Sequence, residues 1–279
     1  MKKYFSAMIA LAVLTFAAGC GGGGEKKAEK AGEQATQEAT ETATSSGYQS
    51  TSVTNGGTIK GTVTFAGAIP KKQVLEVTKD VNVCGKVTHY KENLLVADNK
   101  GIANVVVSIK NISHGKSLES LGESFHLDQD GCAFRPHVSI VPAGVKLTIK
   151  NDDGILHNIH TYSDKNAPIN MAQPGFKKVM THTFDEPEVV RVACDVHNWM
   201  GGYIVVVDNP YTAITDEHGN FQLTDVPAGT YTLEYWQETL GTQTAEVTVT
   251  EGGTVEANFE FAAGSAQIDD SVRLASKTQ

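Results

Sequence analysis

The stretch VRVACDVHNWMGGYIVVV, residues 190–207, places a cysteine, a histidine and a methionine between two valine-rich runs. Both runs have the β-branched composition of strands, and the segment between them is as short as a turn. Because side chains alternate along a strand, Val192 and Cys194 share one face, and the thiol points the same way as the buried valines. His197 and Met200 follow at intervals of three residues. The stretch predicts two adjacent strands whose connecting loop offers thiolate, imidazole and thioether at one end of a β-barrel.

This set of side chains points to a metal. Sulfur ligands combined with imidazole favour copper, and two histidines with one cysteine and a weak axial methionine form the electron-transfer type of copper site. The second histidine is available upstream as His157, which follows a strand and a turn in VKLTIKNDDGILHNIHTYS, residues 145–163. Zinc is the alternative metal, although a thioether is a poor zinc ligand. Taken singly, each of these residues could also be an ordinary buried thiol, histidine or packed methionine.

The pattern resembles that of the cupredoxins. RPHVSIVPAGVKLTIKNDDGILHNIH, residues 135–160, is similar to the segment that carries their first histidine, and CDVHNWM, residues 194–200, is similar to the short ligand loop of the amicyanin type. The resemblance implies a cupredoxin domain over residues 122–208 with one mononuclear type 1 (blue) copper. The ligands that it implies are His157, Cys194, His197 and Met200.

The same resemblance gives expectations for the residues around the ligands. Asn158 would tie its loop to the cysteine loop by hydrogen bonds, with Asp195 as its partner. We expect His197 to be the exit for the electron, and Trp199 to belong to an exposed apolar patch. The function implied is single-electron transfer, with a redox protein such as a c-type cytochrome as partner and no enzymatic activity.

The rest of the chain from Gly57 onward consists of short β-type runs separated by turn residues, which predicts an all-β protein. TDEHGNFQLTDVPAGTYTLEYW, residues 215–236, resembles the carboxypeptidase regulatory-like (transthyretin-like) domain, and GTIKGTVTF, residues 57–65, looks like its first half. We therefore expect a small discontinuous β-sandwich over 56–112 and 209–262, into which the cupredoxin Greek-key β-barrel is inserted. A plain succession of domains along the chain is the alternative.

The beginning of the chain reads as an export signal. Two lysines precede an apolar run that closes on Gly-Cys, and AAGC resembles the lipobox of bacterial lipoproteins. This implies that residues 1–20 are a signal peptide and that Cys20 is lipidated, which anchors the protein to a membrane. The alternative is a plain secretory signal. We expect a disordered linker over 21–55, a tail over 263–279, and an outer-membrane lipoprotein that is periplasmic or on the cell surface.

Two cysteines remain once Cys20 and Cys194 have roles. In an exported protein Cys84 and Cys132 would form a disulfide, with two free thiols as the alternative. The net charge of −9 argues against nucleic acid as a partner. Two other functions stay open at this point. One is a periplasmic or surface protein that binds copper for handling, and the other is a metal-free surface β-module.

Overall fold

The structure is a computed structural model that describes residues 47–263. The predicted signal peptide, the lipidation at Cys20 and nearly all of the predicted tail lie outside the described residues. Within the described part, the prediction of an all-β fold is confirmed. None of the helices there has the length and hydropathy that crossing a membrane requires.

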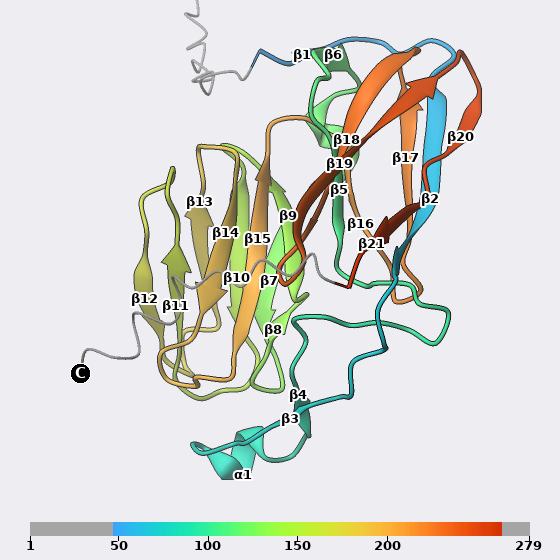
Figure 1. The fold of residues 1–279 in the computed structure, drawn as a ribbon. Helices are drawn as coiled ribbons and strands as arrows, with labels where there is room; N and C mark the ends of the chain where they lie inside the picture. Colours follow the sequence, from blue (N-terminus) through green and yellow to red (C-terminus); the bar gives the residue numbers. More distant parts are fainter. Residues whose placement is uncertain (1–46, 264–279) are drawn as a thin grey trace, which may run out of the picture. The chain divides into compact units, whose positions relative to one another are not determined.

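Strands β7 to β15 form two sheets around one core (Figure 1). One sheet has the order β13-β10-β7-β8 and the other the order β12-β11-β14-β15-β9. The pairs β10–β7 and β15–β9 are parallel, so the chain crosses repeatedly from one sheet to the other. The strand bounds are β7 Phe125–Gln129, β8 Phe134–Arg135, β9 Val138–Pro142, β10 Lys146–Asn151, β11 His157–Tyr162, β12 Asn170–Gln173, β13 Val179–Thr183, β14 Glu188–Ala193 and β15 Gly201–Val207.

The remaining long strands form two further sheets with a core of their own, in the orders β16-β5-β18-β19 and β17-β2-β20, with β21 also on β2. Figure 1 shows β2, in light blue, beside β17 and β20, in orange and red, which come from much later in the chain. The bounds are β2 Gly57–Phe65, β5 Val106–Ile109, β16 Thr212–Ile214, β17 Asn220–Val226, β18 Gly229–Gln237, β19 Gly241–Val249, β20 Thr254–Glu256 and β21 Phe259–Phe261.

The predicted linker is ordered at its end. β1 (Gln49–Ser50) pairs with β6 (His114–Gly115), and the Tyr48 hydroxyl donates a hydrogen bond of 2.6 Å to the carbonyl of Lys116. The Tyr48 ring also packs edge-on against the ring of Tyr211. The boundary predicted at residue 55 was therefore wrong, because one tyrosine supplies the apolar contact that its polar neighbours lack.

The segment between β2 and β5 also differs from expectation. It contains β3 (Val74–Leu75), the short helix α1 (Val81–Cys84) and β4 (His89–Tyr90), and a 3-10 helix follows β5 at Leu118–Leu121. The sequence placed all of 56–112 in the discontinuous sandwich. Instead Cys84, fully buried, belongs to the core of β7 to β15, together with the half-buried Val77 and Val83.

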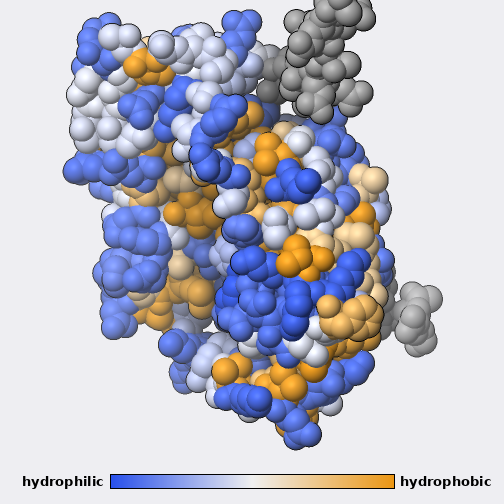
Figure 2. Space-filling model, turned by 180° about the vertical axis from the view of Figure 1, so that it is seen from behind, coloured by the Kyte–Doolittle hydropathy of each residue, from blue (hydrophilic) through white to orange (hydrophobic). Residues whose placement is uncertain are grey.

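The surface is mixed in character. On the face shown in Figure 2, hydrophobic residues reach the surface at separate positions among hydrophilic ones. The most exposed large apolar side chain in the described part is Phe176, with 88% of its area accessible. Single exposed apolar residues of this kind are ordinary and do not by themselves mark an interface.

Candidate metal centre

The loop between β14 and β15 is short and closed by its own backbone. Val190 and Val192 on β14 are fully buried, and Cys194 follows them in the same alternation with 2% of its area exposed. The amide of Met200 donates to the carbonyl of His197 at 2.9 Å, and the amide of Cys194 donates to the carbonyl of Met200 at 3.3 Å. The loop is therefore one tight turn that holds its cysteine and histidine at the end of the sheet.

The second histidine lies on the neighbouring strand. His157 is the first residue of β11, which pairs antiparallel with β14 so that His160 lies opposite Ala193. This register brings the start of β11 beside the loop after β14. His157 and His197 are both fully buried.

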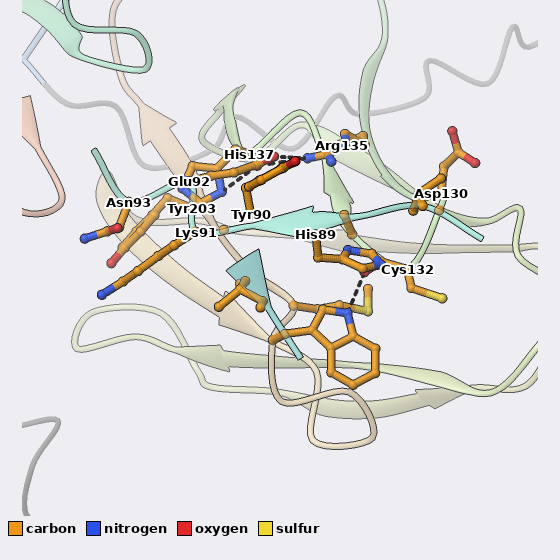
Figure 3. A pocket seen from close by; sticks show the side chains of 18 of the residues that line it. His89, Tyr90, Lys91, Glu92, Asn93, Asp130, Cys132, Arg135, His137 and Tyr203 are labelled. Carbon is orange, nitrogen blue, oxygen red and sulfur yellow. Dashed lines mark hydrogen bonds and ion pairs between the residues drawn. The ribbon is translucent and has the colours of Figure 1, made fainter. Parts of the chain in front are cut away.

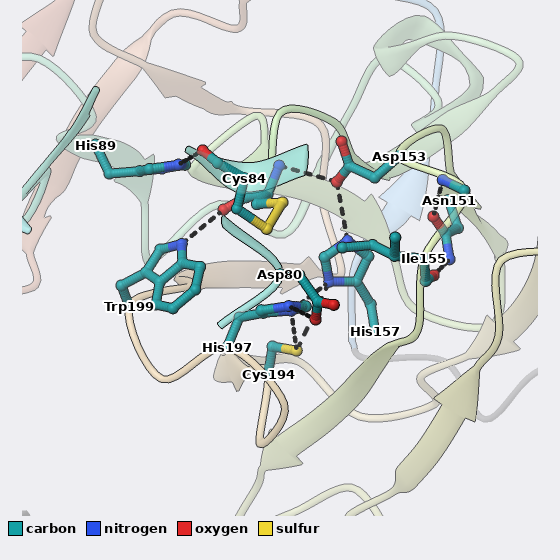
Figure 4. The surroundings of a disulfide bond; sticks show 12 residues. Asp80, Cys84, His89, Asn151, Asp153, Ile155, His157, Cys194, His197 and Trp199 are labelled. Carbon is teal, nitrogen blue, oxygen red and sulfur yellow. Dashed lines mark hydrogen bonds and ion pairs between the residues drawn. A yellow bond between two sulfur atoms is a disulfide. The ribbon is translucent and has the colours of Figure 1, made fainter. Parts of the chain in front are cut away.

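Three donor atoms converge at this point (Figure 4). The Cys194 sulfur lies 3.9 Å from Nδ1 of His157 and 3.8 Å from Nδ1 of His197, and the two nitrogens are 2.9 Å apart. Atoms with these separations share a centre about 2.1 Å from each of them, which is the usual length of a bond between zinc and an imidazole nitrogen. The three side chains are therefore close enough together to hold one metal ion.

The outer nitrogens of both rings are tied to carboxylates. Nε2 of His157 lies 2.9 Å from an Asp153 oxygen, and Nε2 of His197 lies 2.9 Å from an Asp80 oxygen. An ionised carboxylate only accepts hydrogen bonds, so each ring donates from Nε2. In neutral rings the lone pairs of both Nδ1 atoms then face each other beside the thiol. Such an arrangement needs a cation between them, which is either a proton or a metal ion.

The electrostatics agree with this picture. Burial alone raises the pKa of the Cys194 thiol, but hydrogen bonds from His157 and from the Asn158 amide outweigh it, and the pKa lies below its ordinary value. Burial alone lowers the pKa of His157, but its hydrogen bonds to Asp153 and Cys194 outweigh this and raise the pKa. Burial lowers the pKa of His197, which keeps this ring neutral. In the metal-free chain these contacts favour the thiolate form of Cys194 and the protonated form of His157, and a metal would compete with that proton.

Asn158 and Asp195 bridge the two loops. The Asn158 amide donates to the Cys194 sulfur at 3.5 Å, and the Asn158 side chain donates to Asp195 at 3.2 Å. In return the Asp195 amide donates to Oδ1 of Asn158. His160 also contacts Asp195, at 3.0 Å, from the exposed side of the strand. The Cys194 sulfur therefore accepts a hydrogen bond from Asn158, whose position is fixed by Asp195, and such outer contacts orient metal-binding groups.

A disulfide lies next to this cluster. Cys84 and Cys132 are bonded, and the Cys132 amide donates to the same Asp153 oxygen that contacts His157. The indole N–H of Trp199 donates to the Cys132 carbonyl at 3.1 Å. Trp199 is half-buried against His197, and its part in an exposed apolar patch stays a prediction.

No part of the His197 ring is accessible, because Asp80 lies against it, and its role as the exit for the electron stays a prediction. Met200 is buried in the same core cluster as Cys194, and its role as an axial ligand stays a prediction. Sequence reasoning missed both carboxylates. Asp153 stood in the quoted NDDG turn four residues before His157, whereas nothing in the pattern around Asp80 signalled a contact 117 residues away.

A cavity of about 570 Å³, lined by His89, Glu92 and Arg135 among others, lies near this cluster and includes Trp199 in its wall (Figure 3). Two charged pairs lie along its wall: Arg135 donates to Glu92 at 2.9 Å, and His137 lies 2.5 Å from Glu238. Trp199 and Met200 also line the cavity, but none of the three side chains that supply the donor atoms does, so it is distinct from the thiolate cluster.

Comparison with known proteins supports the predicted architecture in one part of the chain. Residues 198–262 match the family model of the carboxypeptidase regulatory-like domain. This confirms the resemblance seen in residues 215–236. The match begins inside the ligand loop, ahead of the boundary predicted at residue 209. No curated protein matches the sequence.

Three solved structures that resemble part of this chain are of copper proteins or cupredoxins. A copper-containing nitrite reductase from Thermus scotoductus is 21% identical over 31% of this chain and 23% of its own, with a TM-score of 0.29. A purple cupredoxin from Nitrosopumilus maritimus is 22% identical over 30% of this chain and all of its own, with a TM-score of 0.26. Amicyanin from Paracoccus versutus is 15% identical over 31% of this chain and 83% of its own, with a TM-score of 0.27.

Proposed function

We propose that this protein is an exported type 1 copper protein that acts in single-electron transfer. The observation that supports it best is the convergence of Cys194, His157 and His197, with a common centre at metal-bond distance from all three donor atoms. Zinc would also accept the thiolate and the imidazoles, but Met200 from the same loop would supply a weak axial thioether, which suits copper and is a poor zinc ligand. Bound copper would supply the one-electron chemistry.

The chain's own residues suit electron transfer better than copper delivery. Both histidines are completely buried, and each is fixed at its outer nitrogen by a carboxylate. Strand pairing between β11 and β14 and the Asn158–Asp195 bridge hold the ligand loops together. A carrier has to release its ion to a partner, whereas a site closed on this many sides keeps the ion and changes little between oxidation states.

The disulfide supports export, because such bonds persist in oxidising compartments. We further propose that β2 and β5 complete the regulatory-like sandwich with β16 to β21, so that the copper domain is an insertion. Anchoring through Cys20 in the outer membrane and a c-type cytochrome as partner remain proposals that follow from the sequence.

Adding Cu(II) to the metal-free protein tests the proposed function. We expect one equivalent of copper to bind and an intense visible band to develop, because a Cu(II)–thiolate bond absorbs strongly. Metal analysis of protein purified without added copper checks the stoichiometry. A protein that binds Cu(I) but stays pale with Cu(II) would be a copper-handling protein, and one that binds no metal would be a surface β-module.

Replacing Met200 by leucine separates an axial ligand from a packing residue. Leucine has a similar volume and keeps the buried contacts. We expect the visible band to persist and the reduction potential to rise, because the axial ligand tunes the potential without carrying the main bonds. Cyclic voltammetry measures the change. A potential equal to that of the original protein would contradict the axial role.

A further inference from the structure

The segment that precedes the disulfide covers the metal centre from outside the barrel. Val77 and Val83 pack on the barrel core, and Cys84 is bonded to Cys132. Between them Asp80 precedes α1 in a left-handed conformation, with φ of 49° and ψ of 40°. In Figure 4 the Asp80 side chain points toward the His197 ring, below the disulfide.

The contact between Asp80 and His197 is shielded from water at the histidine and open to water at the aspartate. The Asp80 carboxylate lies 2.9 Å from Nε2 of His197, which is fully buried, while 38% of the Asp80 side chain is accessible. Asp153 makes the equivalent contact with His157, from a turn that leads directly into the same strand. The two histidines thus have matched carboxylate partners, one local and one from a distant segment.

The geometry points to Asp80 as a positioning residue for the metal centre, one that holds His197 with Nδ1 toward the ion and adds a negative charge behind the ring. This inference rests on the proposed function. A carboxylate on the far nitrogen fixes the tautomer of a metal-binding histidine and makes it a stronger donor. The added negative charge favours Cu(II) over Cu(I), so Asp80 would lower the reduction potential. The segment around the disulfide would then be part of the site rather than a mere cover.

Asp80→Asn isolates the charge. Asparagine tolerates the left-handed conformation as well as aspartate does and keeps an oxygen that accepts the hydrogen bond, so the fold should be preserved. We expect the affinity for Cu(II) relative to Cu(I) to fall about tenfold, which is a rise of about 59 mV in the potential of a one-electron couple. The matched control is Asp98→Asn, the same change at an exposed turn, which should leave the potential unchanged.

A second measurement uses the metal-free protein. Nitrogen NMR of the histidine rings should find His197 protonated at Nε2 in the original chain, and this preference should be lost in Asp80→Ala. A His197 ring protonated at Nδ1, or equal potentials for Asp80→Asn and Asp98→Asn, would overturn the inference. Failure of the original protein to bind copper would overturn the proposed function instead, while the NMR result would still decide whether Asp80 sets the tautomer.

Discussion

Replacing Cys194 by serine is expected to abolish the intense visible band of the copper-loaded protein. The band requires a Cu(II)–thiolate bond, and Cys194 is the only free cysteine among residues 47–263. The pKa of its thiol lies below the ordinary value, which favours the thiolate, whereas a serine hydroxyl keeps its proton. Losing a ligand should cost more than losing an outer partner, so the affinity for Cu(I) should fall by more than about a hundredfold. Absorption and competition with a Cu(I) chelator measure the two effects.

The serine variant also has to be shown to fold. Serine is smaller and polar, and a buried hydroxyl without partners costs free energy, but here the Asn158 amide remains as a donor to it. Far-ultraviolet circular dichroism and tryptophan fluorescence check the fold. Met200→Leu, which should keep its colour, is the matched variant from the same loop. A coloured Cys194→Ser protein would show that the thiolate does not bind the metal.

Local pattern accounts for the part of the site that the sequence could predict. The alternation of Val190, Val192 and Cys194 and the spacing to His197 follow from strand and turn geometry. Placing His157 beside them needed a resemblance, because pairing between β11 and β14 is not local. Within the described chain the all-β class was equally readable from the turn residues between short β-type runs.

The remaining parts of the site depend on tertiary contacts, which leave no periodic pattern in the sequence. The segment from Val74 to Tyr90 has only two short strands and one helical turn, so no pattern says which core it joins. It was assigned to the sandwich by continuity along the chain. The disulfide and the burial of Cys84 place it on the barrel instead, and this is why the contact between Asp80 and His197 was missed.

Removing the disulfide is expected to have the largest effect on stability. In the double variant Cys84→Ser, Cys132→Ser the loop of 48 residues is no longer closed in the unfolded chain. Chain entropy for a loop of that length predicts a loss of about 4 kcal/mol in the free energy of unfolding of the metal-free protein. Release of the segment should also free Asp80 from His197, so the potential of the copper-loaded variant should rise as in Asp80→Asn.

Unfolding is best followed at the barrel itself. The chain has two tryptophans, and in a Trp236→Phe background the fluorescence reports on Trp199, which donates to the Cys132 carbonyl. Urea denaturation of this background with and without the two cysteines gives the difference in free energy, and reduction of the intact disulfide by a thiol should reproduce it. Asp80→Asn in the same background should change the potential while leaving the stability nearly intact. A double variant as stable as its parent, with an unchanged potential, would mean that core packing alone holds the segment on the barrel and that the covalent bond contributes nothing to the position of Asp80.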